Sequence, residues 1–437
     1  MLQEEDRRES SKRPQLLAAG LVDAGCAALA TFAINFFAVR SFDASTLGVY
    51  SVFVTSLFFG ATVAYQLTFV PAEVATLALG GRSRLWVVAQ SLRIGGVTCV
   101  VIGALVPAIA MLLVRSVAEP KVAMAFALTA AAACAVSPIQ DHLRRMLHQA
   151  KISWIASAMS VTQLAVVLGC LALLSSSGVP AQWIPLSALA AANVVSGLLG
   201  WASARRLRGA PVVLTLKHRQ LWWSGRWLAF AGAMQNGAGF LVAAMVVRLA
   251  GAEAMGYAES ARLVAQPLLV LAFGITAVLG PPSMEAGARR ELGRGRRLGR
   301  TYIGIVVPIS VCYLALVGVS WAGNPLIDLL PTAYTVGGLV LVSGLANMLL
   351  GTAQPMNAQL LGGRREVTLA RVEGAGNLVR LAVGATAGIF GPMVVPVGVV
   401  AFGLTRWACY PHALRSLYRT PAPAARSTHE APPLGGI

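Results

Sequence analysis

Apolar runs of about 20 residues recur along the whole 437-residue chain, separated by short polar or basic segments. A helix needs about 20 consecutive apolar residues to cross a hydrocarbon layer of about 30 Å. The runs are rich in Leu, Ala and Val, and they lack the strict alternation of apolar and polar positions that a transmembrane β-strand requires. Because a backbone in lipid must satisfy its polar groups internally, the pattern predicts transmembrane helices.

The apolar pattern predicts twelve membrane-spanning helices. They cover about residues 16–39, 47–70, 85–114, 122–140, 152–175, 184–204, 227–249, 264–286, 301–323, 335–357, 367–390 and 394–414. The division between the last two is the least marked, because only Gly391, Pro392 and a few neighbours separate them.

The longest polar connection divides the predicted helices into two sets of six. It contains the segments RRLRGAP and KHRQLWW, between spans six and seven. The predicted domain organisation is a cytoplasmic tail (1–13), an N-terminal six-helix lobe (14–204), a cytoplasmic linker (205–226), a C-terminal six-helix lobe (227–414) and a second cytoplasmic tail (415–437).

The two halves share a short motif, in which Ala follows Arg after four residues and Gly follows after eight, with an acidic residue between Arg and Gly. The matching positions are Arg40, Ala44 and Gly48 in the first half and Arg248, Ala252 and Gly256 in the second, at an offset of 208 residues. Two interpretations are open: chance similarity of two short connections, or an internal repeat. A repeat predicts two lobes of like orientation around a central cavity, as in many transporters. The predicted fold class is thus an all-α membrane protein with about twelve helices in two six-helix lobes.

Composition agrees with a membrane protein, and charge predicts its orientation. Hydrophobic residues make up 57% of the chain and charged residues 12%, whereas soluble proteins are about a quarter charged. Of the 35 Lys and Arg residues, 26 fall in the two tails and the even-numbered connections, and five fall in the odd-numbered connections. By the positive-inside rule both termini are predicted to be cytoplasmic. The net charge of +18 is then explained by loops beside anionic lipid rather than by nucleic-acid binding.

Sequence signatures of soluble enzymes are missing. The six cysteines lie in apolar runs without C-x-x-C spacing, the five histidines form no ligand cluster, and there is no P-loop. The predicted extracytoplasmic connections are too short for a catalytic domain. The charged segment Met1–Arg13 is interpreted as a retained tail, because no small-residue cleavage site follows it. We therefore expect neither enzymatic activity nor a cofactor or metal.

Two stretches of the sequence resemble a known family. The segment NFFAVRSFDASTLGVYSVFVTSLFF, residues Asn35 to Phe59, and the segment VVRLAGAEAMGYAESARLVAQPL, which begins at Val246, are similar to the first helix pairs of polysaccharide and oligosaccharide flippases. These flippases belong to the multidrug/oligosaccharidyl-lipid/polysaccharide (MOP) exporter superfamily. The chain departs from the usual pattern at Val39, where Ala is typical, and at Tyr50, which lies one place further from its Gly than Tyr257 does.

The resemblance implies a two-lobed flippase of the bacterial inner membrane. Its substrate would be a glycan linked to a lipid of the undecaprenyl-pyrophosphate type. Membrane lipids would surround it, and polysaccharide polymerase or assembly proteins are the implied protein partners.

Ionisable residues within spans are the best candidates for function, because each costs about 2.5–3.5 kcal/mol to place at the bilayer centre. Asp23 in span one begins a small or polar stripe with Ala27, Thr31 and Asn35. It is a candidate for coupling to a cation or proton, or else a carboxylate near the headgroups or paired with an Arg. Glu73, two residues after Pro71, is the second ion-coupling candidate, or else a solvated residue at the cytoplasmic edge.

Candidate substrate-binding residues are mostly cationic or amide side chains. Span eleven carries Glu373, Asn377 and Arg380 at spacings that share one helical face. Arg380 is predicted near mid-span, where its guanidinium could meet phosphate oxygens or form a buried ion pair with Glu373 or Asp23. Arg93 could likewise face inward, or extend to the cytoplasmic interface. The amides Gln235 and Asn236, with Gln354, Asn357 and Gln359, could bind sugar hydroxyls or join helices.

These residues favour a lipid-linked glycan flippase that works by alternating access. A cation-coupled multidrug exporter of the same superfamily is the main alternative, favoured by Asp23 but opposed by the deep arginines. A major-facilitator carrier would be expected to have an acid in the loop after span two, where Gly80-Gly81-Arg82-Ser83-Arg84 has none. A polymerase would need long extracytoplasmic loops.

Overall fold

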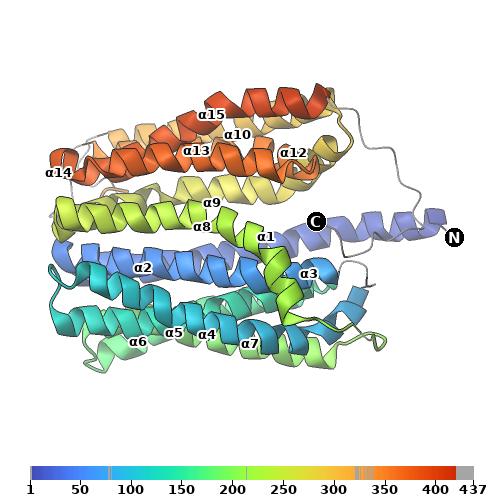
Figure 1. The fold of residues 1–437 in the computed structure, drawn as a ribbon, viewed down its shortest axis with the longest axis horizontal. Coiled ribbons are helices and arrows are strands. Elements are labelled where there is room, and N and C mark those ends of the chain that lie inside the picture. The colour runs from blue at the N-terminus through green and yellow to red at the C-terminus, as the bar shows by residue number, and fades with distance from the viewer. Residues whose placement is uncertain are drawn as a thin grey trace.

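The computed structural model is built from helices joined by short connections (Figure 1). It describes residues 2–419 other than 77, 78, 80, 213, 320–323, 325, 329, 332, 333, 335 and 337, and omits the side chains of residues 2–17 and 277. No strand occurs among the described residues.

The first half of the chain forms one group of helices and the second half another, as Figure 1 shows in blue to green and in yellow-green to red. The N-terminal lobe contains α1 (Leu2–Ser41), α2 (Ala44–Ala64), the π-helix η1 (Tyr65–Phe69), α3 (Val70–Ala75), η2 (Gly81–Val87), α4 (Val88–Val114), α5 (Pro120–Gln149), α6 (Ser153–Ser176), η3 (Ala181–Trp183) and α7 (Ile184–Arg206). The C-terminal lobe contains α8 (His218–Leu249), α9 (Ala252–Ala288), α10 (Leu292–Gly318), α11 (Leu339–Thr352), α12 (Gln354–Gly362), α13 (Glu366–Gly384), α14 (Ala387–Phe390), η5 (Gly391–Met393) and α15 (Val394–Arg419).

Eleven helical segments among the described residues are long and apolar enough to cross a membrane. Helix α13 is not one of them, because Arg371, Glu373 and Arg380 reduce its apolar character. Its 19 residues still extend about 28 Å at 1.5 Å per residue, and it lies beside α8 and α15 in the bundle (Figure 1). The predicted all-α membrane fold with about twelve transmembrane helices in two lobes is confirmed.

Several helices are longer than the apolar pattern predicts, and two of them carry charged residues into the bundle. Helix α5 continues to Gln149 and α9 begins at Ala252, whereas the predicted spans end at residue 140 and begin at residue 264. The predicted spans exclude the segments in which charged residues begin. Arg144, Arg145 and Arg262, which the predicted spans left in connections, lie inside helices. Each of them borders a cavity within the bundle.

The two lobes meet along α2, which packs on α8 and α9. The twin motif lies at the centre of this contact. A Cβ atom added to Gly48 would overlap the carbonyl oxygen of Ala252, and one added to Gly256 would overlap the carbonyl oxygen of Ala44. Each glycine thus allows its helix to touch the backbone of the other copy of the motif, which places the two copies face to face.

The arginines of the motif also reach across the lobe interface, each toward the opposite lobe. Arg40 Nη2 donates to the carbonyl oxygen of Asp328 at 2.8 Å. Arg248 Nε donates to the carbonyl oxygen of Leu113 at 2.6 Å, and its Nη1 donates to Ser116 Oγ at 3.1 Å. We call the paired motifs, residues 40–48 and 248–256, the interlobe latch. It closes the end of the bundle opposite to the start of α1 and the end of α15 (Figure 1).

A tyrosine adds a further contact across the latch. Tyr334 Oη donates to the carbonyl oxygen of Phe42 at 2.6 Å. Burial raises the pKa of Tyr334 to about 12. The hydroxyl therefore keeps its proton near neutral pH, and this contact does not respond to physiological pH changes.

Candidate functional site

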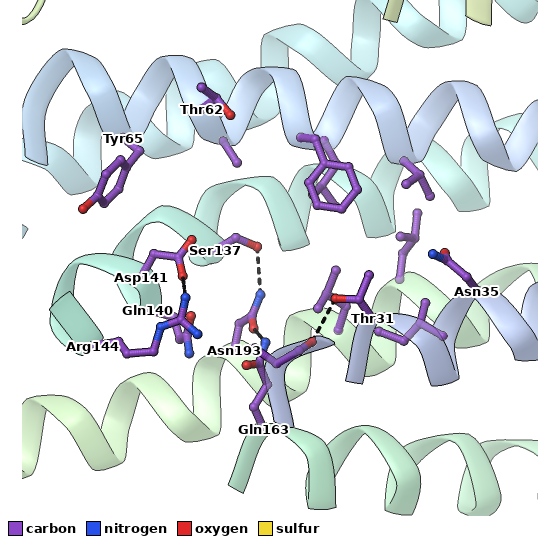
Figure 2. Close-up of a pocket in the computed structure, with 18 of the residues that line it drawn as sticks. Thr31, Asn35, Thr62, Tyr65, Ser137, Gln140, Asp141, Arg144, Gln163 and Asn193 are labelled. Carbon is purple, nitrogen blue, oxygen red and sulfur yellow. Dashed lines mark hydrogen bonds and ion pairs between the residues drawn. The ribbon is translucent and has the colours of Figure 1, made fainter. Parts of the chain in front are cut away.

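Two cavities lie in the interior of the bundle, one on each side of α2. The N-lobe cavity, about 360 Å³, is bordered by residues of α1, α2, η1, α5, α6 and α7, including Asn35, Gln140, Arg144, Gln163 and Asn193 (Figure 2). The C-lobe cavity, about 260 Å³, is bordered by residues of α2, α8, α9, α11, α13 and α15, including Gln235, Asn236, Glu259, Arg262 and Arg380.

Arg380 is the most unusual residue of the C-lobe cavity. Its guanidinium lies against Gly239, at a position ten residues before the end of α8, or about 15 Å along the helix. Its buried Nε has no hydrogen-bond partner, and no ion pair of Arg380 occurs among the described residues. Arg380 is half-buried, and a guanidinium removed from water is normally paired, so this one has a free capacity for an anion.

The two ion pairs that could have neutralised Arg380 are not formed. Glu373 accepts from Arg406 Nη2 at 3.0 Å and from Tyr410 Oη at 3.1 Å, both on α15. Asp23 lies in the other lobe, 3.0 Å from His148 Nε2 and 3.5 Å from Arg144 Nη1. Each carboxylate is therefore satisfied elsewhere.

An ion pair also borders the C-lobe cavity. Glu259 and Arg262, one turn apart on α9, form an ion pair in which Glu259 is buried. The charges of Glu259 and Arg262 cancel each other. Together with Arg380, the residues that line the cavity therefore have a net charge of +1.

The predicted amides separate the two cavities. Gln235 and Asn236 both border the C-lobe cavity. Asn236 Nδ2 donates at 2.9 Å to Thr62 Oγ1, and Thr62 borders the N-lobe cavity. Phe58 of α2 borders both cavities. This hydrogen bond and this ring therefore form the partition between the two spaces.

The remaining predicted substrate contacts lie outside the C-lobe cavity lining. Asn377 is buried next to Glu373, and its Nδ2 donates at 2.9 Å to the carbonyl oxygen of Glu373. Glu373 belongs to the pair with Arg406. Arg93 is exposed on α4 and borders neither cavity, which agrees with the alternative of a side chain that extends to the interface. The structure thus brings Arg380, Gln235 and Asn236 together and leaves the other three apart.

The two ion-coupling candidates lie behind the wall of the N-lobe cavity, each bound to a histidine of α5. Glu73 Oε1 accepts from Tyr65 Oη at 2.5 Å and lies 2.9 Å from His142 Nδ1. With 5% of its surface exposed, Glu73 is not a solvated edge residue, and that alternative was wrong. Asp23 is bound by His148 and Arg144, as in the paired alternative. The rest of its stripe, Ala27, Thr31 and Asn35, borders the cavity.

Several functional candidates were missed by the sequence analysis. Asp141 and Arg144 form an ion pair at 2.7 Å beside the N-lobe cavity, and Glu259 pairs with Arg262 beside the other. Both pairs have i,i+3 spacing inside long helices, a signal that could have indicated them. Gln140, Gln163 and Asn193 also border the N-lobe cavity, but single amides in apolar helices carry no comparable sequence signal.

The fold is similar to that of known transporters. No family model matches the chain, and no curated protein matches its sequence. Among solved structures, the inward-facing form of a multidrug resistance MATE family transporter of the MOP superfamily matches with a TM-score of 0.72 and 13% identity, over 90% of this chain and 96% of that one. A MOP superfamily transporter from Pyrococcus furiosus, described as having a binding pocket of reverse polarity, matches with a TM-score of 0.61 and 14% identity, over 93% and 96%.

An outward-facing form of a multidrug resistance MATE family transporter matches as well, with a TM-score of 0.62 and 14% identity over 92% of this chain and 95% of that one. The TM-scores and the coverage establish the fold, and identities of this size leave the function open. The chain therefore has the multi-pass membrane fold of the MATE transporters of the MOP superfamily.

Proposed function

We propose that this protein is a flippase that moves an anionic lipid-linked glycan precursor across the bacterial inner membrane by alternating access. The observation that carries the proposal is the unpaired guanidinium of Arg380, which borders a cavity deep in the bundle. The carrier of such a precursor is a lipid phosphate or pyrophosphate, whose oxygens match the donors of a guanidinium.

Arg380 is energetically costly where it lies within the bundle. An ionised group inside a membrane is expensive and usually has a functional partner. Because the described residues supply no carboxylate for Arg380, a substrate anion is the partner that would complete the site. Gln235 and Asn236 on the same cavity wall supply amide groups for hydroxyls or further phosphate oxygens.

A cation-coupled multidrug exporter is the second candidate, because two of the similar structures are described as multidrug resistance transporters. A cationic drug would require an unpaired acid in its cavity. The acids that border the two cavities, Glu259 and Asp141, are both paired with arginines. The fold also hosts a transporter whose pocket polarity is described as reversed and whose function is suggested to differ. A major-facilitator carrier has no support from the fold, which is similar to that of MATE transporters.

The interlobe latch suits the alternating-access mechanism. It joins the lobes at one end by two reciprocal helix contacts and two arginine contacts. We propose that this end is extracytoplasmic, which follows from the basic connections at the other end. Opening would separate the two copies of the motif and expose the cavities to the outside. Asp23 and Glu73, each beside a histidine, are the proposed sites at which an ion gradient would act.

The test is a gene deletion with two readouts. Loss of the protein is expected to trap the lipid-linked glycan on the cytoplasmic leaflet, to reduce surface glycan, and to leave sensitivity to cationic dyes unchanged. Unchanged surface glycan together with new dye sensitivity would overturn the proposal in favour of the drug exporter.

A further inference from the structure

The N-lobe cavity contains buried amide groups that lack partners. The side chains of Asn35, Gln140 and Gln163 are only 4%, 3% and 9% exposed, and all three border the cavity (Figure 2). Asn35 Nδ2, Gln140 Nε2 and Gln163 Oε1 make no hydrogen bond among the described residues. Three helices, α1, α5 and α6, thus each present one unsatisfied polar atom at the same cavity.

A chain of hydrogen bonds fixes which atom of Gln163 is free. Ser137 Oγ donates to the carbonyl oxygen of Ala133 at 2.6 Å, so it accepts from Asn193 Nδ2 at 2.8 Å. Asn193 Oδ1 then accepts from Gln163 Nε2 at 2.7 Å, as the dashed lines in Figure 2 show. Reversing any amide would place two donors or two acceptors together. Gln163 therefore presents its oxygen as a free acceptor.

Asn35 is oriented in the same way. Tyr50 Oη donates to Asn35 Oδ1 at 3.4 Å, which leaves the Nδ2 group of Asn35 as a free donor. With the Nε2 group of Gln140, the cavity offers two free donors and one free acceptor on different walls. A ligand that matches them must both accept and donate hydrogen bonds at several points, as a polyhydroxylated molecule does.

One part of the cavity lining is polar but uncharged, which suits an uncharged ligand, and the charged residues Asp141, Arg144 and Arg145 belong to another part. Asp141 is paired with Arg144 at 2.7 Å. Arg145 lies over the ring of Tyr65, 4.8 Å from its centre. In Figure 2, Gln140 lies beside Asp141 and Arg144, whereas Gln163 and Asn35 lie toward Asn193 and Thr31. The rings of Tyr50 and Phe58 also border the cavity and provide apolar surface for the C–H faces of a sugar.

From these observations we infer that the N-lobe cavity is a binding subsite for an uncharged sugar, recognised by the free polar atoms of Asn35, Gln140 and Gln163. The inference rests on the proposed function and deepens it, because it divides the substrate between the lobes. The phosphate of the carrier contacts Arg380 in the C-lobe cavity, and the glycan occupies the N-lobe cavity beyond the Phe58 partition. The volume of about 360 Å³ lies within the range of small-molecule sites, roughly 300–1,000 Å³.

The test uses the full chain in lipid nanodiscs and saturation-transfer NMR. The probes are the methyl glycosides of glucose, galactose, mannose, rhamnose, N-acetylglucosamine and N-acetylgalactosamine. At least one glycoside is expected to receive saturation from the protein. The Gln163→Leu and Asn35→Leu variants are expected to weaken its binding about fivefold or more, the effect of losing one neutral hydrogen bond.

Matched variants distinguish loss of the sugar subsite from a general loss of protein stability. Gln182→Leu removes an amide from η3, outside the cavity lining, and should leave glycoside binding unchanged. Ala61→Met adds bulk to the cavity wall and should block binding without removing a polar group. Every variant must keep the thermal transition of the parent protein. The inference is overturned if no glycoside in the panel is saturated, or if saturation survives both Gln163→Leu and Ala61→Met.

Failure of the sugar-subsite inference can be distinguished from failure of the proposed function. If Arg380→Ala abolishes glycan export while no glycoside binds the N-lobe cavity, only the sugar subsite is wrong. If Arg380→Ala exports glycan normally, the proposed function is wrong, whatever the glycosides do.

Discussion

Arg380 and Arg406 are two arginines of the same lobe with opposite surroundings. Arg406 is 2% exposed and is held by Glu373, Tyr410 and the ring of Phe402. Arg380, on the neighbouring helix α13, has no such partner. The sequence analysis considered Glu373 only as a partner of Arg380, because its pairing with Arg406 depends on how α13 packs against α15.

Arg380→Met is expected to slow transport strongly without lowering stability. The variant removes a buried charge that the described residues do not compensate, so the thermal transition in detergent should stay equal or rise. Transport should fall roughly 10-fold or more, since a charge-assisted hydrogen bond contributes about 1.5–3 kcal/mol. Arg380→Lys keeps the charge but loses the planar fork, and transport should be intermediate. A Met variant that is unstable, or one that transports normally, contradicts the role of Arg380.

Arg406→Met is expected to act on stability. It leaves the half-buried Glu373 without its cation, and breaking a buried pair costs about 3–5 kcal/mol. Replacing Glu373 by Leu in the same chain should recover most of that loss, because an apolar pair of similar volume often replaces a buried ion pair at little cost. Fluorescence-detected thermal unfolding measures both variants. Additive destabilisation in the double variant would show that the pair is not the relevant interaction.

At the residue scale, the sequence analysis found cavity-lining residues where it selected polar or charged side chains deep within a predicted span. It selected Arg380, Gln235 and Asn236, which do border one cavity. It failed where a predicted helix was too short at one end, so that Arg144 and Arg262 were assigned to connections. It also could not identify Gln140 or Gln163, because an isolated amide in an apolar helix becomes informative only once its neighbours are known.

At the scale of elements, the first turns of α2 and α9 show what a repeat in the sequence can and cannot reveal. The spacing of Arg, Ala and Gly suggested two equivalent segments. The structure adds that the segments face each other, because each glycine contacts the backbone carbonyl of the alanine in the other copy. A side chain has no room at Gly48 or Gly256, because the other lobe lies in contact with each glycine.

Gly48→Val is expected to open the latch. The added side chain overlaps the backbone of α9, so the lobes must separate at that end. With the native cysteines replaced, a cysteine at Thr55, which borders the C-lobe cavity, should react faster with a membrane-impermeant maleimide added outside. Gly293→Val is a matched control, since a Cβ atom at Gly293 has no atom within 4 Å. Equal labelling rates in parent, Gly48→Val and control would contradict the latch.

At the scale of the whole molecule, the fold was predictable because the bilayer leaves few options. Each apolar run of sufficient length must be a helix, and eleven segments satisfy that criterion directly. Helix α13 was predicted as a span although its charges exclude it from that group. The cavities were not predictable in detail, because they depend on which faces of α1, α2, α5 and α8 meet.

The predicted orientation can be checked with reporter fusions. Helix α1 begins and α15 ends at the same end of the bundle (Figure 1), and the excess of basic residues predicts that this end is cytoplasmic. Green fluorescent protein inserted after Gly209 should fluoresce, and alkaline phosphatase fused after Gly178 should be active. The opposite pattern would show that the basic connections lie outside, and the latch would then be cytoplasmic.

The most direct test of the account is transport by the purified protein in liposomes. The substrate is a short-chain polyprenyl-pyrophosphate sugar with a fluorescent label on the sugar, and external dithionite reports the fraction in the outer leaflet. We predict that the parent protein and Arg371→Ala, an exposed arginine of the same helix α13, move the label between leaflets, whereas Arg380→Ala does so about 10-fold more slowly or not at all, as expected for loss of a charge-assisted contact. Equal rates for Arg380→Ala and the parent protein, or a parent rate no higher than that of protein-free liposomes, would contradict the account.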